Sequence, residues 1–389
     1  MTSMRLSDRI AHIQPLATTA MHGRADALRC AGEPVIDFSI AISHFPAPPG
    51  VLAAVASELE RGRVMPYTDV GGAAPVREAL CAKLRAENGV EATQAEVIVT
   101  NGAKQALYEA LYALTDPGDA VIVFRPHWPA YVATAQLLDL RPVLADLPAE
   151  LTAAALDALG PARVLIINNP HNPTGKVYTT GELEQVRDWA GRTGAHVIVD
   201  ESYEHLVFNG RHTSLATLCD WRALGIVTLF SASQSYAMMG WRVGFALAPA
   251  PLVRAMQTLQ GPITAAAAHL SQVAAVAAFA GGRPPAMLDD YRERRDKVLQ
   301  LLRTVPWVVM HAPDSGPYLW GDIRMLTHDS IGFADGLLEQ EGVALMPGDA
   351  LGVPGFFRIG YIADDVATLR EGVQRIIAFG ERYRGACSR

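Results

Sequence analysis

Cysteine is scarce in this sequence of 389 residues, and no segment has a strong excess of one charge. The formal net charge is −7, and the acidic and basic residues are scattered, which excludes a basic nucleic-acid tract and a polybasic membrane surface. The cysteines are far apart and lack metal-binding spacing, so we expect reduced thiols in a cytoplasmic protein and no metal centre. They are Cys30, Cys81, Cys219 and Cys387.

Long apolar runs are also absent. Residues 1–20 contain charged side chains such as Arg5 and Asp8, so the uninterrupted core of a secretory signal does not form there. The most apolar stretch, residues 263–280, is rich in alanine and is interrupted by polar side chains. Because alanine is only weakly apolar, this stretch predicts a buried helix rather than a membrane span.

Short β-branched runs alternate with helical patterns through the middle of the chain. This alternation predicts an α/β fold in which a mostly parallel sheet has helices on both faces. Ligands collect at the carboxyl ends of the strands in such sheets. The runs lie at residues 97–100, 120–124, 163–167, 195–200 and 226–230.

The ends of the chain have a different pattern. A charged helical segment at residues 291–302, shorter apolar runs and a last helix at residues 364–379 predict a smaller α+β domain. We expect residues 1–50 to contribute to this small domain and residues 51–288 to form the large, ligand-binding domain. Residues 289–389 would form the rest of the small domain.

Two motifs follow successive predicted strands. Residues 168–175 read Asn-Asn-Pro-His-Asn-Pro-Thr-Gly, and the prolines and glycine fix a turn that aims Asn172 into the cleft. The next strand ends in Asp200, and Tyr203 follows. A buried aspartate is costly unless a cation or several donors meet it, so Asp200 either caps a helix or meets a cation such as a protonated pyridine. Together the two motifs favour a functional site.

A third motif points to a family. Residues 231–244 begin with a serine-rich turn and continue to a glycine, Trp241, Arg242 and Gly244. With the two preceding motifs, this pattern resembles the class I aminotransferases of the fold-type I pyridoxal phosphate (PLP) superfamily, over essentially the whole chain. The resemblance implies a large domain with a mostly parallel sheet of the seven-stranded type between helices, plus a smaller α+β domain. Where the family has its cofactor lysine, this chain has Gln234.

The resemblance implies roles for the residues of a cofactor site. Asp200 would pair with the pyridine nitrogen, Tyr203 and Asn172 would donate to the phenolic oxygen, and Trp128 would stack on the ring. Tyr67 would reach the phosphate of a neighbouring subunit, so a homodimer is implied. The phosphate itself would lie at a helix N-terminus, among hydroxyls and a guanidinium. That cradle would comprise Gly102, Ala103, Lys104, Ser231, Ser233 and Arg242.

The expected substrate is a small amino acid or 2-oxo acid. Arg358 matches the family's arginine for the α-carboxylate, which a guanidinium binds bidentately. Residues 6–46 also resemble a bacterial aspartate-type subgroup, in which Gly-Glu-Pro-Asp stands where this chain reads Ala-Ile-Ser-His at residues 41–44. The glycine allows a close approach of backbone to substrate, so Ala41 alters a substrate-binding position.

Gln234 changes the chemistry that the resemblance implies. A lysine there would form a Schiff base with PLP and would move a proton between substrate and cofactor. Together with Asp200 and Tyr203, residue 234 therefore occupies a catalytic position. The amide of glutamine is neither nucleophilic nor usefully basic, so PLP or its amine form (PMP) is expected to bind without a covalent link.

None of the four lysines is expected to replace the missing amine. Lys83 and Lys297 lie in polar helical segments and are predicted to be solvated. Lys176 is predicted to point outward, and Lys104 is expected at the phosphate end of the cofactor, away from the reacting carbon.

Three interpretations follow from the missing lysine. In the first, the chain is an aminotransferase whose lysine was deliberately substituted to trap cofactor or substrate. In the second, it is a natural lysine-less enzyme that uses PLP or PMP as a lyase, cyclase or dehydratase. In the third, it is a non-catalytic protein that keeps the cofactor pocket as structure. The fold cannot decide between them, because function is a property of the site.

Overall fold

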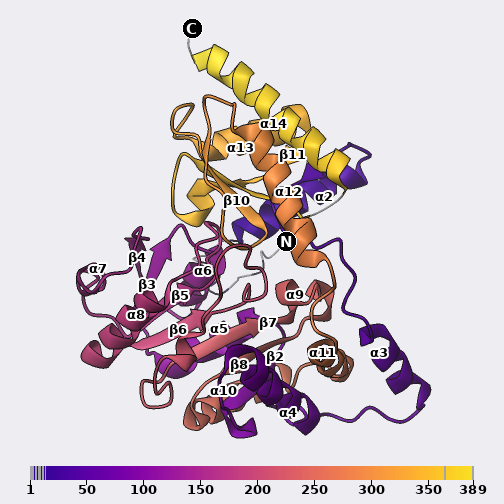
Figure 1. The fold of residues 1–389 in the computed structure, drawn as a ribbon, viewed down its shortest axis with the longest axis vertical. Coiled ribbons are helices and arrows are strands. Elements are labelled where there is room, and N and C mark those ends of the chain that lie inside the picture. The colour runs from indigo at the N-terminus through magenta and orange to yellow at the C-terminus, as the bar shows by residue number, and fades with distance from the viewer. Residues whose placement is uncertain are drawn as a thin grey trace.

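The structure is a computed structural model, and it describes residues 15–362 and 365–387 together with Met4, Ser7, Ile10 and Ile13. Figure 1 shows a larger lower part, which contains the main sheet, and a smaller upper part. The helix α2 (Ala17–Cys30), near the N-terminus, lies in the upper part among elements from the end of the chain. Sequence-distant segments therefore build the smaller part together.

A seven-stranded sheet with the order β2-β8-β7-β6-β5-β3-β4 forms the centre of the larger part. The pairs β4–β3, β3–β5, β5–β6 and β6–β7 are parallel, and only β8 runs antiparallel to both of its neighbours. The predicted mostly parallel α/β sheet is thus confirmed. Its strands are β2 (Val97–Thr100), β3 (Ala120–Arg125), β4 (Arg141–Asp146), β5 (Val164–Asn168), β6 (His196–Asp200), β7 (Val227–Ser231) and β8 (Gly244–Leu247).

Helices cover both faces of this sheet, because successive residues of its central strands are apolar on both sides. In β5, Leu165 and Ile167 pack into one core with α4, α8 and α11, whereas Ile166 packs into a second core with α5 and α10. The helices of this part are α3 (Val51–Glu60), α4 (Ala74–Lys83), α5 (Ala103–Leu114), α6 (Pro129–Leu137), α7 (Ala153–Asp157), α8 (Thr180–Thr193), α9 (Ala232–Ser235), α10 (Ala250–Thr264) and α11 (His269–Gly281).

The smaller part is built on a core in which Trp307, Phe333 and Phe357 are buried, and this core also includes Tyr203 and Phe208 of the larger part. The strand β1 pairs in parallel with β11, with Ile36 opposite Val343, and this pairing joins the N-terminal segment to the C-terminal elements. An antiparallel sheet with the order β12-β13-β10-β9 lies beside it. The elements are β1 (Ile36–Asp37), α12 (Met287–Leu302), β9 (Val309–Met310), β10 (Tyr318–Asp322), α13 (Ser330–Glu341), β11 (Val343–Ala344), β12 (Met346–Pro347), β13 (Phe356–Gly360) and α14 (Val366–Cys387).

Two predictions about helices need correction. Residues 263–280 do not form one helix, because α10 ends at Thr264 and α11 begins at His269, with Ala265 at a φ of 60° between them. The last helix, α14, runs from Val366 to Cys387, beyond its predicted end, and residue 364 lies outside the described residues. No helix in the described part of the chain is long and apolar enough to cross a membrane.

Candidate active site

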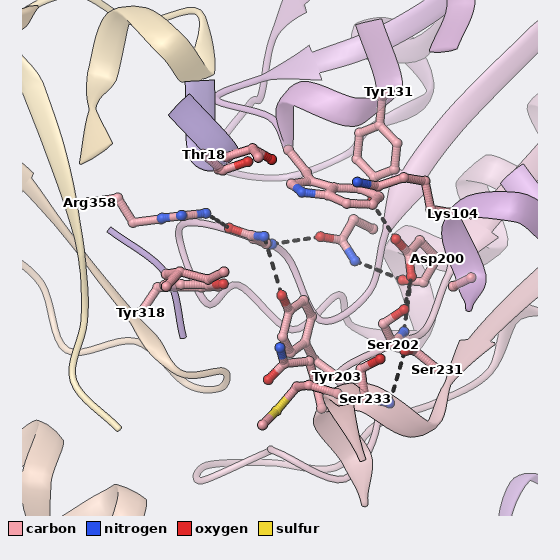
Figure 2. Close-up of a pocket in the computed structure, with 18 of the residues that line it drawn as sticks. Thr18, Lys104, Tyr131, Asp200, Ser202, Tyr203, Ser231, Ser233, Tyr318 and Arg358 are labelled. Carbon is pink, nitrogen blue, oxygen red and sulfur yellow. Dashed lines mark hydrogen bonds between the residues drawn. The ribbon is translucent and has the colours of Figure 1, made fainter. Parts of the chain in front are cut away.

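A cavity of about 270 Å³ lies where the strands β5, β6 and β7 end, and residues of α2, β10 and β13 complete its walls (Figure 2). Most of the predicted site residues line this cavity, although they come from distant parts of the sequence. They are Ala103, Lys104, Trp128, Asn172, Asp200, Tyr203, Ser231, Ser233, Gln234, Arg242 and Arg358. The lining also includes residues to which the sequence had assigned no role, namely Thr18, Thr19, Ile40, Tyr131, Asn168, Ser202, Met239 and Tyr318.

Asp200, the last residue of β6, is buried on the floor of the cavity. Its carboxylate accepts hydrogen bonds from the Tyr131 hydroxyl at 2.6 Å and from the hydroxyl and backbone N–H of Ser202 at 2.6 and 3.0 Å. Burial raises the pKa of the Asp200 carboxyl despite these donors. Within the described residues no cation pairs with it, so the site suits a ligand that brings a positive charge.

A chain of hydrogen bonds links the turn residues to Arg358 (Figure 2). The Asn172 amide donates to the Tyr203 hydroxyl at 3.3 Å, and Arg358 donates to the Asn172 oxygen at 3.2 Å. The backbone N–H of Asn172 is held by Asn168 at 2.7 Å, so the rigid turn fixes the amide in place. Burial raises the pKa of Tyr203 well above its ordinary value, so this hydroxyl is a neutral hydrogen-bond donor.

Arg358 is a buried guanidinium, 1% exposed, at the other side of the cavity. It lies over the ring of Tyr318, 4.0 Å from the ring centroid, and donates to the Ser39 carbonyl at 2.8 Å. Its Nε atom has no hydrogen-bond partner, and no carboxylate among the described residues pairs with the group. A buried cation without an anion is costly, so this geometry suits a carboxylate ligand.

The N-terminus of α5 faces the cavity from a tightly packed corner. A Cβ on Gly244 would lie 2.3 Å from the backbone nitrogen of Ala103, and one on Gly102, at a φ of +87°, would lie 2.4 Å from the Arg242 guanidinium. Arg242 itself donates to the Ser233 hydroxyl at 3.4 Å. The N-terminus of α5, the Ser233 hydroxyl and the Arg242 guanidinium together form an anion site of the kind that binds phosphate.

The aromatic wall comes from Trp128, the N-cap residue of α6, and from Tyr131 in the first turn of that helix. Trp128 packs edge-on against Tyr131, with ring centroids 5.4 Å apart. Trp128 has extended backbone, so helical spacing does not relate the two rings, and no pattern in the sequence indicated Tyr131. The ammonium of Lys104 lies 5.3 Å from the centroid of the Trp128 ring, and burial and the charge of Arg242 lower the pKa of Lys104.

Gln234 lies half-buried on the short helix α9 and lines the cavity. Its Nε2 atom donates to the carbonyl oxygen of Ala41 at 3.4 Å. Ala41 is buried, and neither it nor Gly102 lines the cavity. Tyr67 also lies outside the lining, and it is 95% exposed.

The lysines occupy partly different places from those predicted. Lys83 is buried rather than solvated, because its ammonium meets a carboxylate from a distant turn. Lys176 does not point freely outward, since its ammonium pairs with Glu182 at 2.6 Å and its side chain is only 18% exposed. Lys297 is solvated as predicted. Lys104 is therefore the lysine that lines the cavity.

The fold and the site together define a class of protein, an α/β enzyme scaffold with an anion cradle, a buried aspartate and a buried arginine around one cavity. Residues 33–376 match the family model described as aminotransferase class I and II. The chain is 34% identical to the aspartate aminotransferase of Streptomyces avermitilis, over 96% of each chain. It is 36% identical to the aspartate/prephenate aminotransferase of Cereibacter sphaeroides, over 96% of this chain and 98% of that one.

Solved structures agree with these sequence matches. The aspartate aminotransferase from Rhizobium meliloti superimposes with a TM-score of 0.90 at 30% identity, over 98% of this chain and 100% of that one. The chain belongs to the class I and II aminotransferase family, whose enzymes depend on PLP. The residues present fit this cofactor in two respects: Asp200 lacks a cation, and the start of α5 lines the cavity together with the Ser231 and Ser233 hydroxyls and the Arg242 guanidinium.

Proposed function

We propose that this chain binds PLP or PMP non-covalently and binds an amino acid or 2-oxo acid beside it through the α-carboxylate. The proposal depends on one observation: a buried carboxylate without a cation, Asp200, and a buried guanidinium without an anion, Arg358, share one cavity. Charges are rarely buried unpaired, so both groups suit counter-charges from bound molecules. A protonated ring nitrogen and a substrate carboxylate are such counter-charges.

The residues around these two charges then have distinct tasks. Asp200 would hold the proton on the ring nitrogen, with Tyr131 and Ser202 keeping its carboxylate in place. Tyr203 and Asn172 would donate to the phenolic oxygen. When bound, PLP supplies an electron sink for negative charge that develops on the substrate's α-carbon, and the protein selects the bond to be broken by orienting the substrate.

The similar proteins support a narrower proposal about the substrate. Figure 2 shows Lys104 and Arg358 on opposite sides of the drawn cavity. Lys104 lies with the proposed phosphate cradle, so Arg358 is the cation left for a substrate carboxylate. Since several of the similar proteins are named aspartate aminotransferases, we propose an acidic amino acid as the substrate class.

Tyr67 supports a proposed homodimer. A large aromatic side chain that is 95% exposed is costly to leave in water, and the neighbouring Val64 is 88% exposed. Both lie between α3 and α4, in the segment from which the family's tyrosine reaches the partner's phosphate. We propose that a second copy of the chain covers this segment.

Gln234 would limit what the bound molecules can do. Its amide cannot attack the cofactor's aldehyde, and it cannot accept the proton from the substrate's α-carbon. Lys104 is the lysine of the cavity lining, and it lies against Trp128 rather than beside Gln234. We therefore expect binding to be retained while ordinary transamination stalls.

A second candidate function is a natural lysine-less enzyme of lyase, cyclase or dehydratase type. Its support is the contact between Gln234 and the carbonyl of Ala41. These two positions both depart from the family pattern, and they touch each other. A substitution made only to trap a cofactor would not need a matching change at residue 41.

The experiment that tests both proposals restores the amine. The Gln234→Lys variant is expected to give a PLP absorbance band, to be trapped covalently by borohydride and to exchange amino groups with a 2-oxo acid. The parent protein is expected to bind PLP without covalent trapping, as read by mass spectrometry. Gln300→Lys, at an exposed helical position, controls for the added charge.

The outcomes separate the interpretations. Transamination by Gln234→Lys but not by the parent supports the aminotransferase scaffold. Turnover by the parent that Gln234→Lys abolishes supports the lysine-less enzyme. If neither protein binds PLP or PMP, the proposed cofactor is wrong.

A further inference from the structure

A second buried polar cluster lies behind the turn that carries Tyr203, outside the cavity. Its members are Lys83, Asn88, Glu201 and Glu204, and each is at most 9% exposed. Lys83 is the last residue of α4, and Asn88 ends the π-helical segment η1 (Leu84–Asn88) that follows it. The two glutamates come from the turn after β6, so the cluster joins segments more than a hundred residues apart.

Both carboxylate oxygens of Glu204 accept hydrogen bonds from residues of this cluster. The ammonium of Lys83 pairs with one carboxylate oxygen of Glu204 and donates to the Asn88 oxygen at 2.7 Å. The Asn88 amide donates to the other oxygen of Glu204 at 2.6 Å. Burial opposes the charged carboxylate, but the charge and hydrogen bond of Lys83 and the charges of His205 and His212 together outweigh it and lower the pKa of Glu204 to about 2. The pair is therefore ionised and held from two directions.

Glu204 also closes the turn that shapes the floor of the cavity. Its backbone N–H donates to the Glu201 carbonyl at 3.0 Å, which makes Ser202 and Tyr203 the two central residues of a four-residue turn. Figure 2 shows both side chains at the cavity, where Ser202 holds the Asp200 carboxylate. Glu201 and Glu204 lie on the reverse side, so a shift of Glu204 would move both central residues.

Other titratable groups surround the pair of Lys83 and Glu204. Glu201, Glu204 and His212 bring possible ligand atoms within 4.8 Å of one another, which resembles a metal site. The ammonium of Lys83 already supplies the cation there. Burial and the charge of Glu204 raise the pKa of Glu201 well above its ordinary value. Burial lowers the pKa of His212 to about 4, so the His212 ring is neutral at pH 7. The buried ion pair of Lys83 is therefore the one with Glu204, and the partly exposed Glu87 carboxylate lies 3.6 Å from the same ammonium.

We propose that Lys83 is a positioning residue for the cofactor site, which fixes Ser202 and Tyr203 by clamping Glu204 from behind. This inference depends on the proposed function, because it assumes that the turn holds PLP. It assigns a task to a lysine that lies outside the cavity and has no direct access to bound molecules.

The test compares Lys83→Met with Lys297→Met. Lys297 is a matched control, because it also forms an ion pair with a glutamate, but its side chain is 44% exposed on α12. PLP binding is followed by fluorescence titration, and the absorbance maximum of bound PLP is recorded. Amide hydrogen exchange of the peptide spanning residues 201–206 is measured without cofactor, so the clamp is tested even if the protein binds no PLP.

For Lys83→Met we expect at least tenfold weaker PLP binding, a shifted absorbance maximum and faster exchange in the 201–206 peptide. Lys297→Met should stay within twofold of the parent in each measurement. If Lys83→Met does not fold, Lys83→Met/Glu204→Gln replaces it, because that variant leaves no unpaired buried charge, and the same changes are expected. Unchanged exchange in the 201–206 peptide, or unchanged affinity and absorbance in a parent that binds PLP, would overturn the proposal.

Discussion

Replacing Asp200 with asparagine is expected to separate cofactor binding from stability. Asparagine keeps the shape of the side chain and can still accept from Ser202, while its amide can donate to the Tyr131 hydroxyl. The lost interaction is the charged hydrogen bond to a ring nitrogen. Such bonds contribute about 1.5–3 kcal/mol net, so PLP should bind roughly 10- to 100-fold more weakly.

The stability of the cofactor-free protein should change in the other direction. Burial raises the pKa of Asp200 in the folded state, so the folded protein loses stability as pH rises through that raised value and keeps it below the ordinary pKa of the carboxyl. Asp200→Asn removes this loss, so its melting temperature at pH 7 should equal or exceed that of the parent.

Fluorescence titration with PLP and thermal unfolding without it provide the two readouts for Asp200→Asn. Asp146→Asn, at a side chain that is 79% exposed, is the matched control. Unchanged PLP affinity in Asp200→Asn would refute the proposed role of the carboxylate. A melting temperature lowered by more than about 4 °C would instead show that Asp200 is mainly a structural partner of the turn.

Three further predictions concern the substrate clamp, the phosphate corner and a buried acid. In the Gln234→Lys background, Arg358→Lys should raise the KM for the amino acid at least tenfold with a smaller change in kcat, because an ammonium cannot bind a carboxylate bidentately. A tenfold fall in kcat with an unchanged KM would contradict this. Gly244→Ala should lower the free energy of unfolding, measured by urea titration, by about 3 kcal/mol, because the new Cβ would meet the backbone of Ala103. A change below about 1 kcal/mol would show that the packing around residue 244 can relax. Burial raises the pKa of Glu109 to about 7. As pH rises from 4.5 to 7, the free energy of unfolding of the parent should therefore fall by up to about 3 kcal/mol relative to that of Glu109→Gln. Parallel plots of unfolding free energy against pH for the two proteins would exclude this.

The strands that the sequence predicted best are those whose burial is continuous. Residues 97–100 match β2, and residues 120–124 fall within β3, because runs of β-branched residues satisfy both faces of a central strand. The two strands that no run indicated have weaker patterns. The edge strand β4 contains Pro142 and is partly exposed along its length, while β8 begins at Gly244 and runs antiparallel.

The sequence predicted those cavity residues whose role can be explained within a single short motif. Asp200 is recognisable because a carboxylate at a buried strand end needs a partner, and Ser202, two residues later, offers the local donor that such aspartates use. Tyr318 could not be found in this way. Tyr318 contributes to the cavity because β10 and β13 pair and place its ring under the guanidinium of Arg358. The local sequence around either residue does not reveal that pairing.

The lysines show why the exposure of a charged side chain cannot be predicted from its sequence neighbours alone. The helix that ends at Lys83 has polar neighbours, and solvation was a reasonable prediction until Glu204, far along the chain, supplied a buried counter-charge. The same logic applies to residue 234. A lysine side chain is one methylene longer than glutamine, so its amine would extend past the point where the Gln234 amide meets the Ala41 carbonyl. Restoring the amine therefore tests more than charge: it tests whether the cavity still has room for the atom that the family's chemistry requires.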